Sequence, residues 1–143
     1  MGCDINLHIE TKKDGKWYHY SNPFVYRDYA LFTLIAGEKL GRRPSEMEPT
    51  TGLATHCEIP DDASFVTKYS YELDKNDHHV TCACVLSADN IPELQHQYEK
   101  YCGKRPGSLD TNLEHTIFQT YVNHDALCCH EGWDDLRIVC WFD

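Results

Sequence analysis

The sequence has no long apolar run and few basic residues. None of its stretches approaches the roughly 18 to 20 consecutive apolar residues of a membrane-spanning helix. Its first residues lack the basic, apolar and small-residue regions of a signal peptide, so we expect a cytoplasmic protein. The 13 Lys and Arg residues against 23 Asp and Glu give a formal net charge of −10, which opposes binding to many phosphates at once. We therefore expect neither a membrane nor duplex nucleic acid as a partner.

The motifs of several large enzyme classes are also missing. There is no Gly-rich phosphate loop, no Gly-x-Ser-x-Gly elbow and no His-Glu-x-x-His helix. The eight cysteines do not form the closely spaced pairs of zinc ribbons or fingers, since only one residue separates Cys82 from Cys84 and Cys128 is adjacent to Cys129. In a cytoplasmic protein we expect such cysteines to be buried thiols.

The residues that are present predict a single folded domain spanning 1–143. The chain is 41% hydrophobic and 12% aromatic, which is enough to build a core. A strict alternation of apolar and polar residues at the start predicts a strand whose apolar face carries Cys3, Ile5, Leu7 and Ile9. The pair Asp14-Gly15 predicts a hairpin turn, and the aromatic stretch 17–20 predicts the returning strand.

Helices and further strands are predicted along the rest of the chain. Apolar residues at helical spacing predict helices over 27–36, 90–102 and 110–122, the first with Asp28 as its cap and Gly37 as its stop. The proline-containing segment 37–62 predicts a long irregular connection, and 74–79 a polar turn. Strands are predicted over 64–71, 81–86 and 136–142, the last in the sheet interior. The fold class is α+β, with helices on one face of a largely antiparallel sheet.

Several segments of this chain resemble a family of small phage-encoded proteins that begin Met-Gly-Cys-Asp-Ile-His. The similarity lies in residues 1–10, Gly15-Lys16-Trp17, residues 27–32 with Ala36-Gly37, residues 60–64 and residues 135–143. This chain has Asn6 where such proteins usually carry histidine. The resemblance implies a viral origin, and an accessory viral protein is expected to act on a component of its host.

The polar face of the first strand is one candidate site, and its residues are Asp4, Asn6, His8 and Glu10. Same-face neighbours on a strand lie about 7 Å apart, so Asp4 and Glu10 are about 20 Å from each other and cannot share one metal ion. Two neighbours can converge on a ligand if an adjacent strand supplies a third group, such as His19 or Arg137. The alternative is that this face is solvated while the apolar face packs on helices.

Local positive charge marks a second candidate, because an anionic ligand needs it despite the net charge of −10. Arg27 stands at the start of a predicted helix, and Arg42 and Arg43 stand in the long connection. We predict that these arginines and the first strand line one pocket. The alternative is that they are solvated, or that Arg27 pairs with a nearby acid such as Asp28 or Glu38.

Histidines and carboxylates offer possible metal ligands. A zinc or manganese site would use His8 and Glu10 together with Asp77 or His79, which follow a charged segment. His124 and Cys128, four residues apart, are a weaker candidate for zinc. An exposed turn and buried thiols are the alternative explanations.

Three functions remain open from these observations. The first is a homo-oligomeric binding protein without a cofactor that captures a small host molecule, such as a nucleotide-derived immune signal, with Asp4, Asn6, His8, Glu10, Arg27, Arg42 and Arg43. An amide at Asn6 can still hydrogen-bond a ligand but cannot replace a general base, which favours capture. The second is a metal-dependent hydrolase of a nucleotide or phosphodiester. The third is an acidic protein that blocks a host protein directly.

Overall fold

The first and last strands of the chain are neighbours in the middle of one antiparallel sheet. The structure, a computed structural model, describes residues 2–25, 27–56, 58–103 and 133–143. In these residues the sheet order is β2-β1-β5-β4-β3, and all neighbouring strands are antiparallel. The strands are β1 (Ile5–Lys13), β2 (Lys16–Ser21), β3 (Thr55–His56), β4 (Thr81–Ser87) and β5 (Asp135–Phe142).

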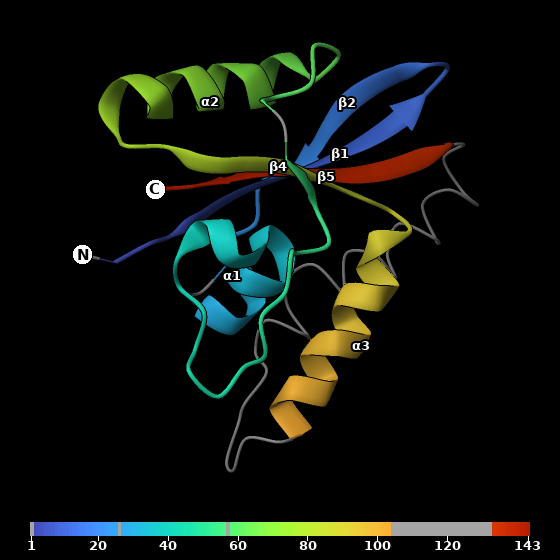
Figure 1. Cartoon of the computed structure of the whole chain (residues 1–143). Helices are drawn as coiled ribbons and strands as arrows, with labels where there is room; N and C mark the ends of the chain where they lie inside the picture. Colours follow the sequence, from blue (N-terminus) through green and yellow to red (C-terminus); the bar gives the residue numbers. More distant parts are fainter. Residues whose placement is uncertain (1, 26, 57, 104–132) are drawn as a thin grey trace.

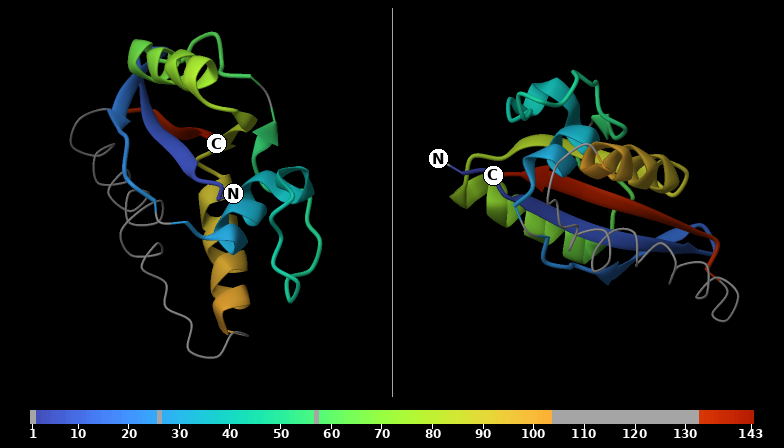
Figure 2. Two further views of the ribbon diagram at one scale, coloured as in Figure 1. Left: turned by 90° about the vertical axis from the view of Figure 1, so that its left-hand side faces the viewer. Right: turned by 90° about the horizontal axis from the view of Figure 1, so that it is seen from below.

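Helices cover both faces of this sheet. On one face lie α1 (Tyr29–Ala36), which continues into the 3-10 helix η1 (Gly37–Leu40), and α3 (Asn90–Gly103), whereas α2 (Phe65–Asp77) lies on the opposite face (Figure 1). The left-hand view of Figure 2 shows the same arrangement, with α2 on one side of the sheet and α1 and α3 on the other. The predicted α+β class is confirmed, but the prediction that the helices share one face is wrong. The helix predicted over 110–122 lies outside the described residues.

Local sequence signals account for the first half of the fold. The strand and the hairpin predicted at the start are present, and Asp14 and Gly15 both have positive φ in the turn. Asp28 caps α1, because its carboxylate accepts the N–H groups of Ala30 and Leu31. Gly37 ends the helix with a φ of 77°. The predicted strands at 81–86 and 136–142 correspond to β4 and β5.

The strand predicted over 64–71 is wrong, because this segment begins α2. Ser64 is the N-cap and accepts the N–H of Thr67, and the helix continues through most of the predicted polar turn to Asp77. Its large apolar residues Phe65 and Tyr69 are exposed. The buried residues of α2 are Thr67 and Tyr71, while several of its apolar residues face outward, so the helix lacks the apolar stripe by which an amphipathic helix is recognised.

Both faces of β1 are buried, which neither prediction for its polar face anticipated. The apolar face, with Leu7 and Ile9, packs in the main core against α1 and α3. On the other face His8 and Glu10 are 2% and 0% exposed, because His8 packs against His19 and Trp141 and Glu10 lies against the start of α2. The polar face is therefore buried at His8 and Glu10, whereas Asn6 is half-buried and Asp4, just before the strand, is exposed.

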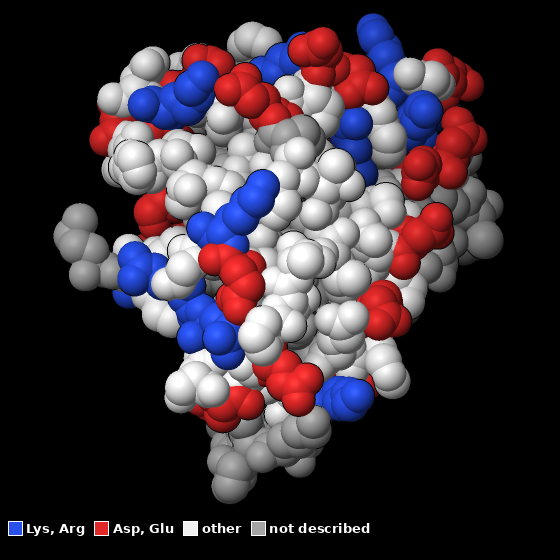
Figure 3. Space-filling view, viewed as in Figure 1, with Lys and Arg blue, Asp and Glu red and all other residues white. Residues whose placement is uncertain are grey.

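The surface shows no single charged field on the side seen in Figure 3. There Lys and Arg side chains are interspersed with Asp and Glu around the margin, and the centre is largely uncharged (Figure 3). In the described part of the chain, every helix is too short or too polar to cross a lipid bilayer.

Candidate functional site

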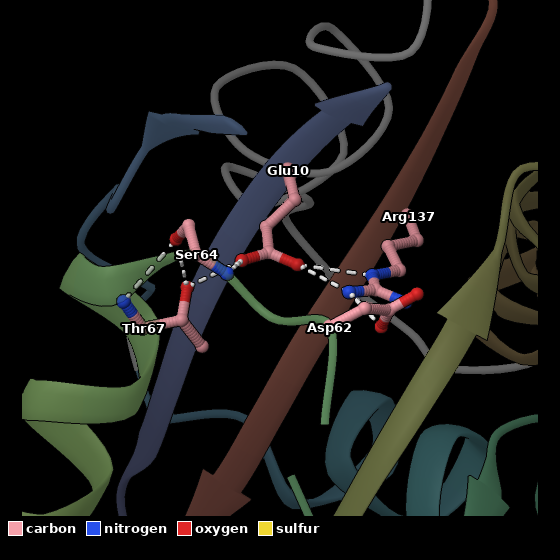
Figure 4. A network of polar contacts seen from close by, with 5 residues as sticks. All are labelled: Glu10, Asp62, Ser64, Thr67 and Arg137. Atoms are coloured by element: carbon pink, nitrogen blue, oxygen red, sulfur yellow. Dashed lines mark hydrogen bonds and ion pairs between the residues drawn. The ribbon is translucent and has the colours of Figure 1, made fainter. Parts of the chain in front are cut away.

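A buried network centred on Glu10 connects the sheet to the start of α2 (Figure 4). One carboxylate oxygen of Glu10 accepts the backbone N–H of Ser64 and the hydroxyl of Thr67, both at 2.8 Å. The other accepts Arg137 Nε at 2.9 Å, and Arg137 also reaches Asp62 at 3.0 Å. Burial of this carboxylate is possible because each oxygen has hydrogen-bond donors. Glu10 therefore positions α2 and has little capacity left to bind a ligand.

His8 and His19 form a hydrogen-bonded pair beside this network. Nδ1 of His8 lies 3.0 Å from Nε2 of His19 on the neighbouring strand β2. The His8 ring stacks on Trp141 with centroids 5.0 Å apart. Burial, together with the nearby His19 ring, lowers the pKa of His8 to about 4, and burial also lowers the pKa of His19. At neutral pH the pair is therefore uncharged and offers hydrogen-bonding nitrogens.

A hollow of about 470 Å³, which we call the β2–α2 groove, opens next to this pair. Its walls come from β2, from the segment 61–64 and from the first turn of α2. The lining residues whose side chains can bind a ligand through charge, hydrogen bonds or ring stacking are Lys16, His19, Asp61, Asp62, Phe65 and Lys68. Phe65 is 79% exposed, so most of its ring is available to a ligand. The volume of the groove lies in the range of small-molecule sites, about 300 to 1,000 Å³.

The residues predicted to share one pocket lie in separate places. His8 and Glu10 are buried, whereas Asp4 is exposed at the start of the chain and pairs with Arg27 at 2.9 Å. This pairing holds the pKa of Asp4 below its ordinary value. Asn6 is half-buried, and its Nδ2 has no hydrogen-bond partner in the part of the chain that is described.

The three predicted arginines are likewise distributed around α1. Arg27 lines a hollow of about 380 Å³ that also contains the acidic residues Asp28 and Glu46. Arg42 is exposed and places its guanidinium 5.8 Å from the ring centre of Tyr29. Arg43 pairs with Glu38 at 2.6 Å. That these residues bind a ligand stays a prediction, but they do not surround one cavity with the first strand.

The predicted metal ligands are not gathered either. Asp77 and His79 are exposed around the C-terminal end of α2, whereas His8 and Glu10 are held by their own partners in the interior. In the described ranges, the group that could hold a metal is instead Asp74, His78 and Asp143, whose ligand atoms all lie within 4.8 Å of one another. His124 and Cys128 lie outside these ranges.

A further hollow of about 490 Å³ lies between η1 and residues 49–51. Its lining includes Glu38, Lys39 and His56, but the Glu38 carboxylate is already bound by Arg43. The β2–α2 groove is smaller and combines an imidazole, lysines, carboxylates and an exposed aromatic ring. We therefore take the groove as the candidate site.

Part of this site was accessible from the sequence. His19 and Arg137, named from the sequence as groups that an adjacent strand could supply beside His8 and Glu10, do contact these two residues, whereas their binding of a ligand stays a prediction. Asp62, Phe65 and Lys68 were not predicted, because 64–71 was interpreted as a strand. The Ser64 N-cap was the available signal for a helix start there.

No family model, curated protein or solved structure matches the chain. The groove must therefore be interpreted from its own chemistry.

Proposed function

We propose that this protein binds and sequesters a small host molecule, a nucleotide-derived immune signal, in the β2–α2 groove. The observation that carries the proposal is the position of the His8–His19 pair, with His19 in the wall of a hollow of about 470 Å³. The resemblance to phage-encoded proteins supports a role inside a host cell. In this proposal the protein acts in the host cytoplasm.

The groups around the groove match the parts of a nucleotide. Lys16 and Lys68 can bind a phosphate group, and they stand near the N-terminal end of α2, where the helix dipole is positive. The exposed ring of Phe65 can stack on a base. The neutral His19 ring can donate or accept a hydrogen bond without adding charge.

The state of the buried residues favours capture over catalysis. A general base must have a free lone pair within reach of the substrate. The Glu10 carboxylate is occupied by Ser64, Thr67 and Arg137, and His8 is stacked on Trp141 and bonded to His19. These groups hold the walls of the groove in place, which is what a binding site requires.

The test uses the purified full-length chain with adenosine, AMP and a cyclic dinucleotide as probes in calorimetric titrations. Replacing the groove residue Lys68 with Ala should weaken binding of the phosphate-bearing probes at least about tenfold and change adenosine binding little. The matched control is Lys75→Ala at the other end of α2, which should bind like the unchanged protein.

Lysate from infected cells with active defence then supplies the natural ligand. The protein is incubated with it, washed and denatured, and the released small molecules are identified by mass spectrometry. Release of an intact nucleotide derivative supports the proposal, and loss of this molecule in Lys68→Ala assigns it to the groove. A folded protein that retains nothing and binds none of the probes contradicts it.

Two other results would point to the remaining alternatives. Conversion of a probe during incubation would overturn capture in favour of a hydrolase. Salt-sensitive retention of one host protein without a small molecule would favour the acidic blocking protein.

The proposal includes assembly of several copies, because a small domain gains binding surface at an interface between protomers. Light scattering after size-exclusion chromatography measures the mass directly. A value near the 16.6 kDa of one chain at micromolar concentration would contradict this part.

A further inference from the structure

We propose that Asp74, His78 and Asp143 bind one divalent transition-metal ion, manganese or zinc, at the C-terminal end of α2. Their ligand atoms lie within 4.8 Å of one another. This site is separate from the β2–α2 groove, which lies at the N-terminal end of the same helix. It also differs from the ligand set predicted from the sequence.

Helix and strand geometry bring the three side chains together. Asp74 lies in the last turn of α2, and His78 is the C-cap, whose backbone N–H donates to the Asp74 carbonyl at 2.7 Å and so holds the two residues close together. Asp143 follows β5 directly, two residues after Trp141, so it continues the sheet face that α2 covers. The end of the chain lies beneath this end of α2 (Figure 1).

Two of the ligands are held in place by groups that would not touch the ion. The indole Nε1 of Trp141 donates to Asp74 Oδ2 at 2.8 Å, which orients the carboxylate and leaves its other oxygen available. The backbone of Asp143 exchanges two hydrogen bonds with Asp4, at 2.9 and 3.0 Å. Hydrogen-bonded supports of this kind are the usual surroundings of metal ligands.

The electrostatics of the cluster favour a cation. Two carboxylates this close repel each other, and no Lys or Arg of the described chain forms an ion pair with either. The adjacent Lys75 instead places Nζ over the ring of Tyr71, 5.3 Å from its centre. The last carbonyls of α2 add the negative end of the helix dipole. A bound divalent ion would neutralise this charge.

The donor set indicates the kind of ion. One imidazole nitrogen and two carboxylates without a thiolate suit manganese or zinc better than copper(I) or an iron–sulfur cluster. Bonds of about 2 Å to a shared ion bring ligand atoms to within about 4 Å of each other, so small side-chain rotations complete the site. Three protein ligands leave at least one coordination position for water.

The test measures metal binding by the full-length protein after removal of metals with a chelator. Manganese is titrated first, because thiolates bind it poorly and the chain has eight cysteines. Electron paramagnetic resonance reports free Mn²⁺, and we expect one ion bound per chain. At a hundredfold excess over Kd, the melting temperature should rise by about 9 °C. Zinc is titrated in the same way.

Variants of neighbouring residues make the assignment specific. His78→Ala and Asp143→Asn should each weaken manganese binding at least about tenfold. The matched controls are His79→Ala and Asp77→Asn, which are exposed neighbours outside the cluster and should bind like the unchanged protein. Asp143→Asn leaves the contact between Trp141 and Asp74 intact, so its loss of binding cannot be attributed to that contact.

The proposal is overturned if the folded protein binds no manganese or zinc. It is equally overturned if His78→Ala and Asp143→Asn bind as tightly as the unchanged protein, or if the two controls lose binding to the same extent. Neither result depends on whether the groove binds a nucleotide, so the two proposals are tested separately.

Discussion

At the scale of single residues, the buried Glu10–Arg137 ion pair should contribute more to stability than the exposed pairs do. A charge removed from water is tolerated only when nearby groups replace its hydration, and Glu10 has Ser64, Thr67 and Arg137 for this purpose. The exposed pair Asp4–Arg27 has a similar distance but remains in water on both sides. The two ion pairs have similar distances, but because only one is buried we expect unequal contributions to the free energy of unfolding.

Replacing Glu10 with Ala should lower the free energy of unfolding by about 3 to 5 kcal/mol, because Arg137 would lose its buried partner. The control is Asp4→Ala at the exposed pair, which should cost less than about 1 kcal/mol. Urea unfolding followed by circular dichroism measures both. Similar losses in the two variants would contradict the role assigned to Glu10.

The buried His8 should make the protein less stable in mild acid. Its folded-state pKa of about 4 lies below the ordinary value of 6.5, so the unfolded chain takes up the proton first as the pH falls. The stabilising contribution is complete above pH 6.5 and is lost toward pH 4, a difference of up to roughly 3 kcal/mol. Chemical unfolding at several pH values measures this slope.

His8→Gln should reduce the slope between pH 6.5 and 4 by the uptake of about one proton. The same substitution at the exposed His96 is the control and should leave the slope as it is. A slope that is unchanged in His8→Gln would mean that other groups cause the loss of stability in acid.

At the scale of elements, α2 shows why polarity patterns alone can misassign a helix. The side chains that meet the sheet include Thr67, Tyr71 and Asp74, which bond to Glu10 or pack against Trp141. The sheet face beneath them combines the polar Glu10 with the apolar Val139 and Trp141, so the residues that meet it form no continuous apolar stripe on the helix. Recognising the helix therefore required knowledge of its partner, whereas α1 carried an ordinary apolar pattern and was predicted correctly.

The connection after α1 contains a close backbone crossing that only glycine permits. Gly52 has a φ of +84°, and a Cβ added there would lie 2.6 Å from both Gly37 N and Ile35 O. Gly15 also has positive φ, but a Cβ there would have open space. A substitution at Gly15 would therefore measure the free-energy cost of the left-handed conformation alone, whereas one at Gly52 would add the cost of a steric collision.

Gly15→Ala should therefore cost about 1 kcal/mol of unfolding free energy for the left-handed conformation alone. Gly52→Ala should cost at least about 2 kcal/mol more, because the backbone of residues 35–37 must move. Thermal and urea unfolding measure the difference, and an equal cost at both positions would contradict the crossing.

At the scale of the whole molecule, the two ends of the chain are joined in the centre of the sheet. Each residue of β1 from Ile5 to Lys12 pairs with β5. Side chains of β5 belong to the hydrophobic clusters on both faces, and β1 adds Leu7 and Ile9 to one face and the buried Glu10 to the other. Neither layer of helices can keep its packing surface if these strands separate. The layers should therefore unfold together.

We expect a single unfolding transition with the same midpoint in far-ultraviolet circular dichroism and in tryptophan fluorescence. The first signal reports helices on both faces, and the second includes Trp141 beneath α2. Glu10→Ala should shift both midpoints equally, although Glu10 touches only the α2 side. Separate midpoints would show that the α2 layer unfolds independently.

The sequence by itself determined the terminal strands, the hairpin, α1, α3 and the α+β class, because these follow from side-chain alternation, helical spacing and local caps. Only the tertiary structure decided that α2 is a helix on the second face, that Glu10 pairs with a residue 127 positions away, and where the groove lies. The physical reason is that a buried polar side chain is stabilised by partners distant in the chain, and no local pattern specifies them.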